Sequence, residues 1–146
     1  MRCPIRQVLF LRRFRGLTGG HLKVRDYFGH IASSGTHEPR VWFTDDTRWD
    51  SSNPWCDARA SVVDEPTEVR PDALFLAGLD WRFLTREQRE RGVVPVVNLV
   101  QHIRHADPAD ERFEFLRHRA VRVCVSREVA DAVSAAGANG PVVSES

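Results

Sequence analysis

Short apolar runs that alternate with helix-like stretches are the feature that most constrains how this chain can fold. The runs that we expect to form strands are Gln7–Leu11, Arg40–Thr44, Ala73–Ala77, Val94–Val100, Val121–Val125 and Pro141–Val143. The stretches that we expect to form helices are His21–Ala32, Thr85–Arg91, Asp110–His118 and Arg127–Ala136. This alternation is typical of βαβ units, so we predict an α/β fold with a Rossmann-like open parallel sheet of about six strands and helices on both faces.

Local signals refine these boundaries. Ser126 can cap the last helix through its hydroxyl, and Gly137 can end that helix. Asp107 can cap the helix expected over Asp110–His118. Pro39 is expected just before the second strand. Residues 45–71 are irregular and rich in Asp, Ser, Pro and Trp, so we expect a long loop with one helical turn, of a kind that is usually functional or mobile.

Size and composition indicate one domain over residues 1–146 and exclude several classes of protein. The apolar share of 42% and the charged share of 28% are those of a globular chain. A net charge of +1 argues against general binding to nucleic acid. No apolar run is long enough to span a membrane. The three cysteines, Cys3, Cys56 and Cys124, are widely spaced, which favours a reduced, cytoplasmic setting, with Cys124 buried.

Residues 11–21 form the first stretch that could carry chemistry. Ligands of open parallel sheets bind at the carboxyl ends of strands, and this stretch follows the first strand. Gly19 and Gly20 would let the backbone approach a ligand at the start of a helix, and Arg13 and Arg15 could hold a phosphate. The stretch matches neither a dinucleotide fingerprint nor a phosphate-binding P-loop. Glycine could equally serve the turn geometry alone, and both interpretations stay open.

The second stretch, residues 98–108, follows the most apolar run. His102 and His105 would lie at the edge of the sheet, where an imidazole can transfer a proton or bind a sugar hydroxyl. His102, His105 and Asp107 are too few to make a structural zinc site, so no metal is expected.

Two further places carry acids. Asp45 and Asp46 follow the second strand, where an acid can bind a ribose, although an Asp pair that starts a turn is favoured. Asp80 and Trp81 follow Gly78 and could bind a sugar, with packing favoured for Trp81.

These stretches together resemble the N-terminal domain of GT-B glycosyltransferases, especially glycosyltransferase family 4. V-L-F-L-R-R-F-R-G-L-T-G-G resembles the first strand and glycine loop of that family, and P-V-V-N-L-V-Q-H resembles its fourth strand. R-V-C-V-S-R-E-V-A-D-A-V-S-A-A-G is similar to its fifth strand, serine and helix. The chain departs from the family where it ends in V-V-S-E-S, since the family segment reads close to P-N-G.

The resemblance implies a sugar transfer from a nucleotide-sugar donor to a hydroxyl acceptor, with no cofactor besides the nucleotide-sugar. Gly19 and Gly20 would lie near the donor phosphates and the acceptor. His102 would match the cleft histidine that contacts the transferred sugar, and Gln101 and His105 remain candidates for the same position. We expect the donor-binding C-terminal domain to be absent and transfer by this chain alone to be negligible, because diphosphate charge would develop without its stabilising groups.

Two other functions stay open. The chain could be a non-catalytic α/β module that binds a partner or an anionic small molecule, with Trp49 and Trp55 exposed in the long loop as interface anchors. It could also be a dinucleotide-dependent enzyme domain. Binding of sugar nucleotides, of NAD or of neither would separate the three functions.

Overall fold

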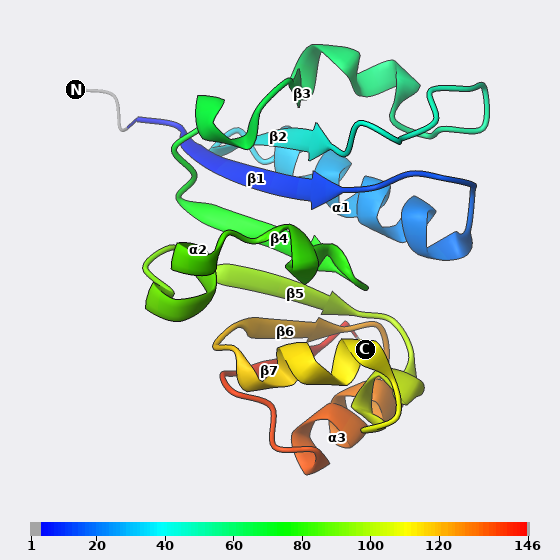
Figure 1. The fold of residues 1–146 in the computed structure, drawn as a ribbon, viewed down its shortest axis with the longest axis vertical. Coiled ribbons are helices and arrows are strands. Elements are labelled where there is room, and N and C mark those ends of the chain that lie inside the picture. The colour runs from blue at the N-terminus through cyan, green and yellow to red at the C-terminus, as the bar shows by residue number, and fades with distance from the viewer. Residues whose placement is uncertain (1–3, 146) are drawn as a thin grey trace. The chain divides into compact units, whose positions relative to one another are not determined.

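The computed structural model describes residues 4–145 and has an α/β fold, which confirms the predicted class. The chain forms two compact units, Met1–Leu74 and Phe75–Ser146. Each unit has its own parallel strands and helices (Figure 1). That residues 1–146 act as a single domain stays a prediction.

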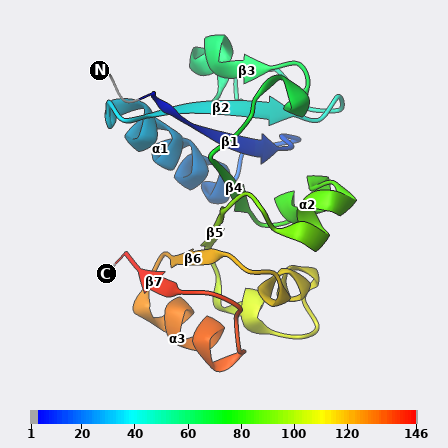
Figure 2. The same ribbon diagram turned by 90° about the vertical axis from the view of Figure 1, so that its left-hand side faces the viewer.

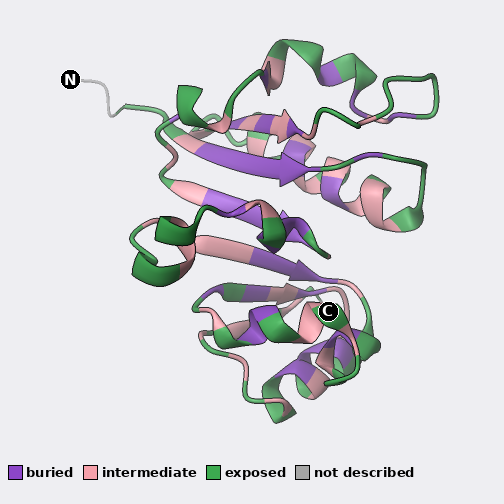
Figure 3. Cartoon of the chain, viewed as in Figure 1, coloured by how far each residue is buried: buried purple, intermediate pink, exposed green. Residues whose placement is uncertain are grey.

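The first unit is built on two long strands. β1 (Arg6–Arg12) pairs in parallel with β2 (His37–Phe43), and β2 pairs in parallel with β3 (Val62–Val63), so that the order is β3-β2-β1. The helix α1 (Gly19–Ser33) connects β1 to β2, which makes a βαβ unit. Most of β1 is buried (Figure 3), because it is covered on both faces.

An aromatic cluster forms the core of this unit. The ring centroids of Phe10 and Phe28 are 5.3 Å apart, and those of Phe28 and Trp55 are 4.8 Å apart, all in edge-to-face arrangements. Trp55 is 0% exposed, so the expectation that it is an exposed interface anchor is wrong. Its large apolar surface contributes more when it is buried against β1 and α1 than it would in solvent.

The segment after β2 is more regular than the sequence predicts. It contains two 3₁₀ helices, η1 (Cys56–Ser61) and η2 (Pro66–Glu68), with β3 between them. A strand of two residues shows no periodicity, which is why the sequence gives no signal for it. Pro39 lies inside β2 and not before it.

The strands of the second unit follow one another in chain order. β5 (Val96–Val100) pairs in parallel with β6 (Val121–Cys124), and β6 with β7 (Val142–Ser144). β4 (Ala73–Ala77) begins just before the boundary between the units and neighbours β5.

Five helices connect these strands. They are η3 (Asp80–Phe83), α2 (Arg86–Arg91), η4 (Ile103–Ala106), η5 (Glu111–Arg117) and α3 (Arg127–Ala135). Figure 2 shows α2 and α3 on opposite sides of the strands of this unit. The Ser126 hydroxyl accepts a hydrogen bond from the Val129 N–H at 3.2 Å, as predicted. The helix expected over Asp110–His118 is a 3₁₀ helix capped by Asp110, so the prediction that Asp107 caps it is wrong.

A buried arginine holds the second unit together. Arg122 of β6 is 0% exposed, and its guanidinium donates to the carbonyl oxygens of Phe115 and His118, both at 2.7 Å, and of Asn139 at 3.3 Å. Burial lowers the pKa of Arg122 to about 10, which still leaves the side chain charged at neutral pH. Cys124 is buried beside it, as predicted.

Gly140 lies at a tightly packed position of this unit. It has φ +110°, and a Cβ at this position would lie 2.1 Å from the carbonyl oxygen of Ala120. We expect Gly140→Ala to lower the free energy of unfolding by roughly 3 kcal/mol, because it adds a steric clash to an unfavourable φ. The matched control Gly137→Ala, with φ +77° and open space around its Cβ, should cost only about 1 kcal/mol. Equal costs in urea unfolding would contradict this account of Gly140.

Candidate functional site

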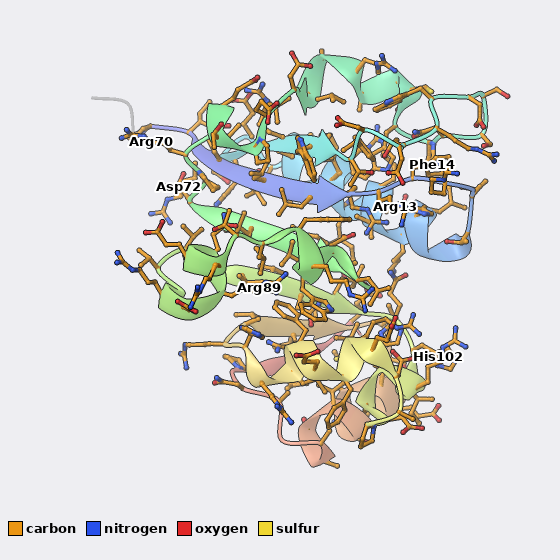
Figure 4. All side chains as sticks on the ribbon, viewed as in Figure 1. Arg13, Phe14, Arg70, Asp72, Arg89 and His102 are labelled. Atoms are coloured by element: carbon orange, nitrogen blue, oxygen red, sulfur yellow. The ribbon has the colours of Figure 1, made fainter. Side chains whose placement is uncertain are left out.

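The loops that follow β1 and β2 are joined into one surface. The Thr44 N–H donates to the carbonyl oxygen of Arg12 at 3.1 Å, and the Arg48 N–H donates to that of Phe14 at 2.7 Å. The Phe14 N–H donates to the Thr47 hydroxyl at 3.2 Å. These bonds fix the backbone of residues 12–14 against residues 44–48, so the side chains that they carry have defined positions (Figure 4).

Arg13 and Arg15 both contact Asp46 on this surface. The Arg13 guanidinium lies 2.6 Å from the Asp46 carboxylate, and Arg15 donates to the Asp46 carbonyl oxygen at 2.8 Å. A hydrogen bond from the Thr44 hydroxyl, followed by Arg13, lowers the pKa of Asp46. Asp45 and Asp46 lie in a turn, which confirms the favoured interpretation of this pair.

The N-terminus of α1 follows this surface along the chain. Its N-cap residue, Thr18, makes no side-chain cap, and the first turn contains no acidic residue. The first helical N–H groups of any helix have no intrahelical acceptor and carry partial positive charge. Gly19 and Gly20 supply two of these groups, and neither makes a backbone hydrogen bond within residues 4–145. The start of α1 is therefore open to an anion.

The glycines of this turn have no conformational reason to be glycine. Gly16, Gly19 and Gly20 all lack a positive φ, and a Cβ on Gly16 or Gly19 would meet no atom within 4 Å. Gly19 and Gly20 form the first turn of α1 and not a loop before it. The interpretation that glycine serves the turn geometry alone is thus wrong for Gly16 and Gly19. That these glycines make room for a ligand stays a prediction.

A pair that sequence reasoning missed lies beneath this turn. Arg12 is 6% exposed, and its guanidinium lies 2.8 Å from Nδ1 of His21, the third residue of α1. The rings of His21 and Phe14 are 4.9 Å apart, edge to face. Burial and then the Arg12 charge lower the pKa of His21 to about 4. The available signal was an arginine at the end of a strand and a histidine directly after the glycine pair.

In the segment after β5, the two candidate histidines, His102 and His105, differ in their exposure to solvent. His102 is exposed, and its Nδ1 accepts a hydrogen bond from the Arg104 N–H at 3.0 Å. Since Nδ1 accepts, the proton of the neutral ring is on Nε2, and His102 presents a donor to solvent. Gln101 is partly buried beside it. This arrangement suits hydrogen bonding to a sugar hydroxyl better than removal of its proton.

His105 is turned into the protein. It is 7% exposed, and its ring centroid lies 6.3 Å from that of His102. Burial, and then the Arg112 charge, lowers the pKa of His105 to about 4. A groove of about 570 Å³ lies beside η4, lined by Ile103, Ala106 and Ala132 among others, and neither histidine lines it. His105 is therefore better placed to pack η4 than to bind a ligand.

Asp80 and Trp81 are both buried. The Asp80 carboxylate accepts a hydrogen bond from the Ala77 N–H at 3.1 Å, which ties η3 to the end of β4. The Trp81 ring stacks on Phe115 at 6.0 Å between centroids, so packing, the favoured interpretation for Trp81, is confirmed. Asp80 supports the turn after β4 and offers little carboxylate surface to a sugar.

Within the described part of the chain, no three His, Cys, Asp or Glu side chains gather as a metal site would require. None of the helices formed by residues 4–145 is both long and apolar enough to cross a bilayer. Comparison of the chain with models of protein families, with curated proteins and with solved structures finds no match.

The lowered pKa of His21 predicts how stability varies with pH. Between the ordinary pKa of 6.5 and the folded value of about 4, the unfolded chain binds a proton that the folded chain does not. The free energy of unfolding should therefore fall as the pH is lowered through this range, by about 1–2 kcal/mol for a ring that is only partly buried.

Urea unfolding of His21→Gln at pH 7 and pH 4.5 checks this prediction. The variant should lose part of the pH dependence, and the rest includes the same effect from His105. Leu22→Gln is the matched control, because Leu22 is exposed on the same helix turn and does not titrate. An unchanged slope in His21→Gln would contradict the lowered pKa.

Proposed function

We propose that this chain is the acceptor-side, Rossmann-like half of a GT-B glycosyltransferase. In the complete reaction a nucleotide-sugar donor gives its sugar to a hydroxyl acceptor. The turn between β1 and α1 binds phosphate groups of the substrates through Gly19, Gly20, Arg13 and Arg15. His102 contacts the sugar through its Nε2–H. The cofactor requirement is met by the nucleotide-sugar itself.

The observation that supports this proposal most is the excess of donors at the β1–α1 turn. The N-terminus of α1 has neither a side-chain cap nor an acid in its first turn, and Arg13 and Arg15 are exposed beside it in sequence. Gly16 and Gly19 leave open space that the fold does not require. An uncapped helix start, with two exposed arginines close in sequence that Asp46 orders, favours a phosphate-bearing ligand.

A dinucleotide-dependent enzyme fits this surface less well. Such a domain uses an acid after its second strand to bind the ribose hydroxyls. The acid at that place, Asp46, already accepts from Thr44 and pairs with Arg13. A ribose would have to displace both contacts.

The alternative of a partner-binding module has lost part of its support. Trp55 belongs to the core, and Trp49 is 36% exposed with the Arg59 guanidinium 4.1 Å from its ring centroid. One half-exposed tryptophan that already stacks on an arginine is a small anchor for a protein interface.

Calorimetric titration with uridine diphosphate glucose, glucose 6-phosphate and NAD tests the proposal. We expect saturable binding of at least one of the first two ligands, weakened by added salt because charged groups carry it. Saturable binding of NAD in their place would favour the dinucleotide enzyme. Absence of binding by all three would overturn the proposal and favour the partner-binding module.

The substitution Gly19→Asp should change the stability of the protein and its affinity for phosphate in opposite directions. An acid in the first turn of α1 should stabilise the helix by about 0.5 kcal/mol through its dipole, yet it should weaken phosphate binding at least tenfold through repulsion. Thermal unfolding and the same titrations measure the two effects.

Gly29→Ala is the matched control for Gly19→Asp. Gly29 lies in the interior of α1, and its Cβ would make an ordinary contact at 3.5 Å with Arg25. It should raise stability by about 0.5–1 kcal/mol without any effect on binding. Full ligand affinity in Gly19→Asp would mean that the helix N-terminus does not contact the ligand.

A further inference from the structure

Arg12 and His21 form a unit whose chemistry goes beyond the residues assigned so far. Arg12 ends β1, His21 is the third residue of α1, and 2.8 Å separates the guanidinium nitrogen from Nδ1. Arg12 is 6% exposed as a residue, so its hydrogen bond to His21 is made largely away from solvent. The pair thus ties the end of the strand to the first turn of the helix.

The identity of the two partners fixes where the histidine proton lies. A guanidinium has five N–H donors and no acceptor, so Nδ1 of His21 must accept the hydrogen bond. A neutral imidazole carries one proton, and that proton is then on Nε2. His21 is partly exposed, and no hydrogen bond to its Nε2 forms among residues 4–145. The Nε2–H of His21 can therefore donate a hydrogen bond to a ligand.

The charge state of the ring is fixed as well. The Arg12 guanidinium from β1 and the Phe14 ring from the loop pack against His21, and the positive charge of Arg12 disfavours an imidazolium there. Burial and the Arg12 charge accordingly keep the pKa near 4. His21 stays neutral across the physiological range, and it cannot serve as a general base, because Nδ1 is occupied and Nε2 is protonated.

We infer that His21 is a further ligand-binding residue of the β1–α1 turn, which donates its Nε2–H to a phosphate oxygen, and that Arg12 is the positioning residue that locks this donor. The inference rests on the proposed function, since it adds to the same anion site. The ligand class follows from the surroundings. The exposed groups near in sequence, Arg13, Arg15 and the first N–H groups of α1, are donors, and a ligand rich in acceptors would compete with Asp46 for the two arginines. A phosphate ester is such a ligand.

A donor that stays neutral binds phosphate with an affinity that depends little on pH, unlike a donor that titrates. Its hydrogen bond to phosphate should change little as the pH falls from 8 to 5.5, because the ring stays largely neutral in that range. Removal of the Arg12 charge would let the pKa of His21 rise. Burial, the larger cause of the lowered pKa, would remain, but the ring would take up a proton more readily as the pH falls and attract phosphate more strongly.

Titration with uridine diphosphate glucose between pH 8 and pH 5 at constant ionic strength tests the inference, since the phosphates of this probe do not titrate there. Glucose 6-phosphate in a second arm at pH 8 distinguishes a donor phosphate from an acceptor phosphate. For the ligand that binds, we expect His21→Phe to lower affinity about tenfold, as loss of a hydrogen bond to a charged group does. The matched control His30→Phe, on the last turn of the same helix, should change affinity less than twofold.

The pH dependence of ligand affinity in Arg12→Met distinguishes the positioning role of Arg12 from a purely structural one. We expect wild-type affinity for uridine diphosphate glucose to vary less than twofold over the pH range. Affinity in Arg12→Met should rise about threefold or more as the pH falls from 7.5 to 5.5. Should this variant fail to fold, ¹⁵N NMR of the His21 ring in the wild-type protein reports the tautomer directly, with protonated Nε2 and unprotonated Nδ1 expected.

The outcomes separate the two proposals. Wild-type binding with no loss in His21→Phe, or an Nδ1-protonated ring, would overturn the role of His21 and leave the proposed function standing. Absence of wild-type binding to both phosphate ligands would overturn the proposed function, and the inference with it.

Discussion

The parallel pairing of β1 with β2 is the constraint on which the candidate site depends. The register sets Arg12 opposite Phe43, so both strands end at the same level. The loops that leave them are then close enough to exchange the backbone bonds between residues 12–14 and 44–48. A shift of this register by one residue would break these bonds and turn the buried side chains of β1 to the other face. The aromatic core beneath, centred on Phe10, Phe28 and Trp55, opposes such a shift.

Three consequences follow at the end of β1. Arg12 is held inside the unit, where it fixes the tautomer of His21. Arg13 and Arg15 are held outside, where Asp46 orders them. The chain then enters α1 without a cap, at a place where glycine is not needed by the backbone. The uncapped helix start and the glycines add little to the stability of the fold, and under the proposed function they serve the binding of an anion. Departures of this kind from local folding rules are expected at functional or strained sites.

Much of the fold could be predicted because its signals are local. The apolar runs gave β1, β4 and β6 nearly to the residue, and the Ser126 hydroxyl and Gly137 gave the ends of α3. β3 was missed because two valines show no period, and the 3₁₀ form of η5 was missed because its apolar spacing resembles that of an α-helix.

The site was less predictable, since its decisive contacts join residues distant in sequence. Glycine content pointed to the β1–α1 turn, yet it could not tell whether Gly19 served geometry or a ligand. The bond between Arg12 and His21 depends on which way a strand-end arginine turns, and β1 is buried on both faces, so alternation gave no guide. His102 and His105 looked equivalent in sequence, whereas one is exposed and the other is buried.

Mapping of amide chemical shifts during titration with uridine diphosphate glucose tests the central claim most directly. The account predicts that the largest changes fall on residues 13–21, with smaller changes on residues 44–48 that are bonded to them. Changes confined to the groove beside Ile103 and Ala132, or to the pocket formed by Val8, His30 and His37, would contradict it.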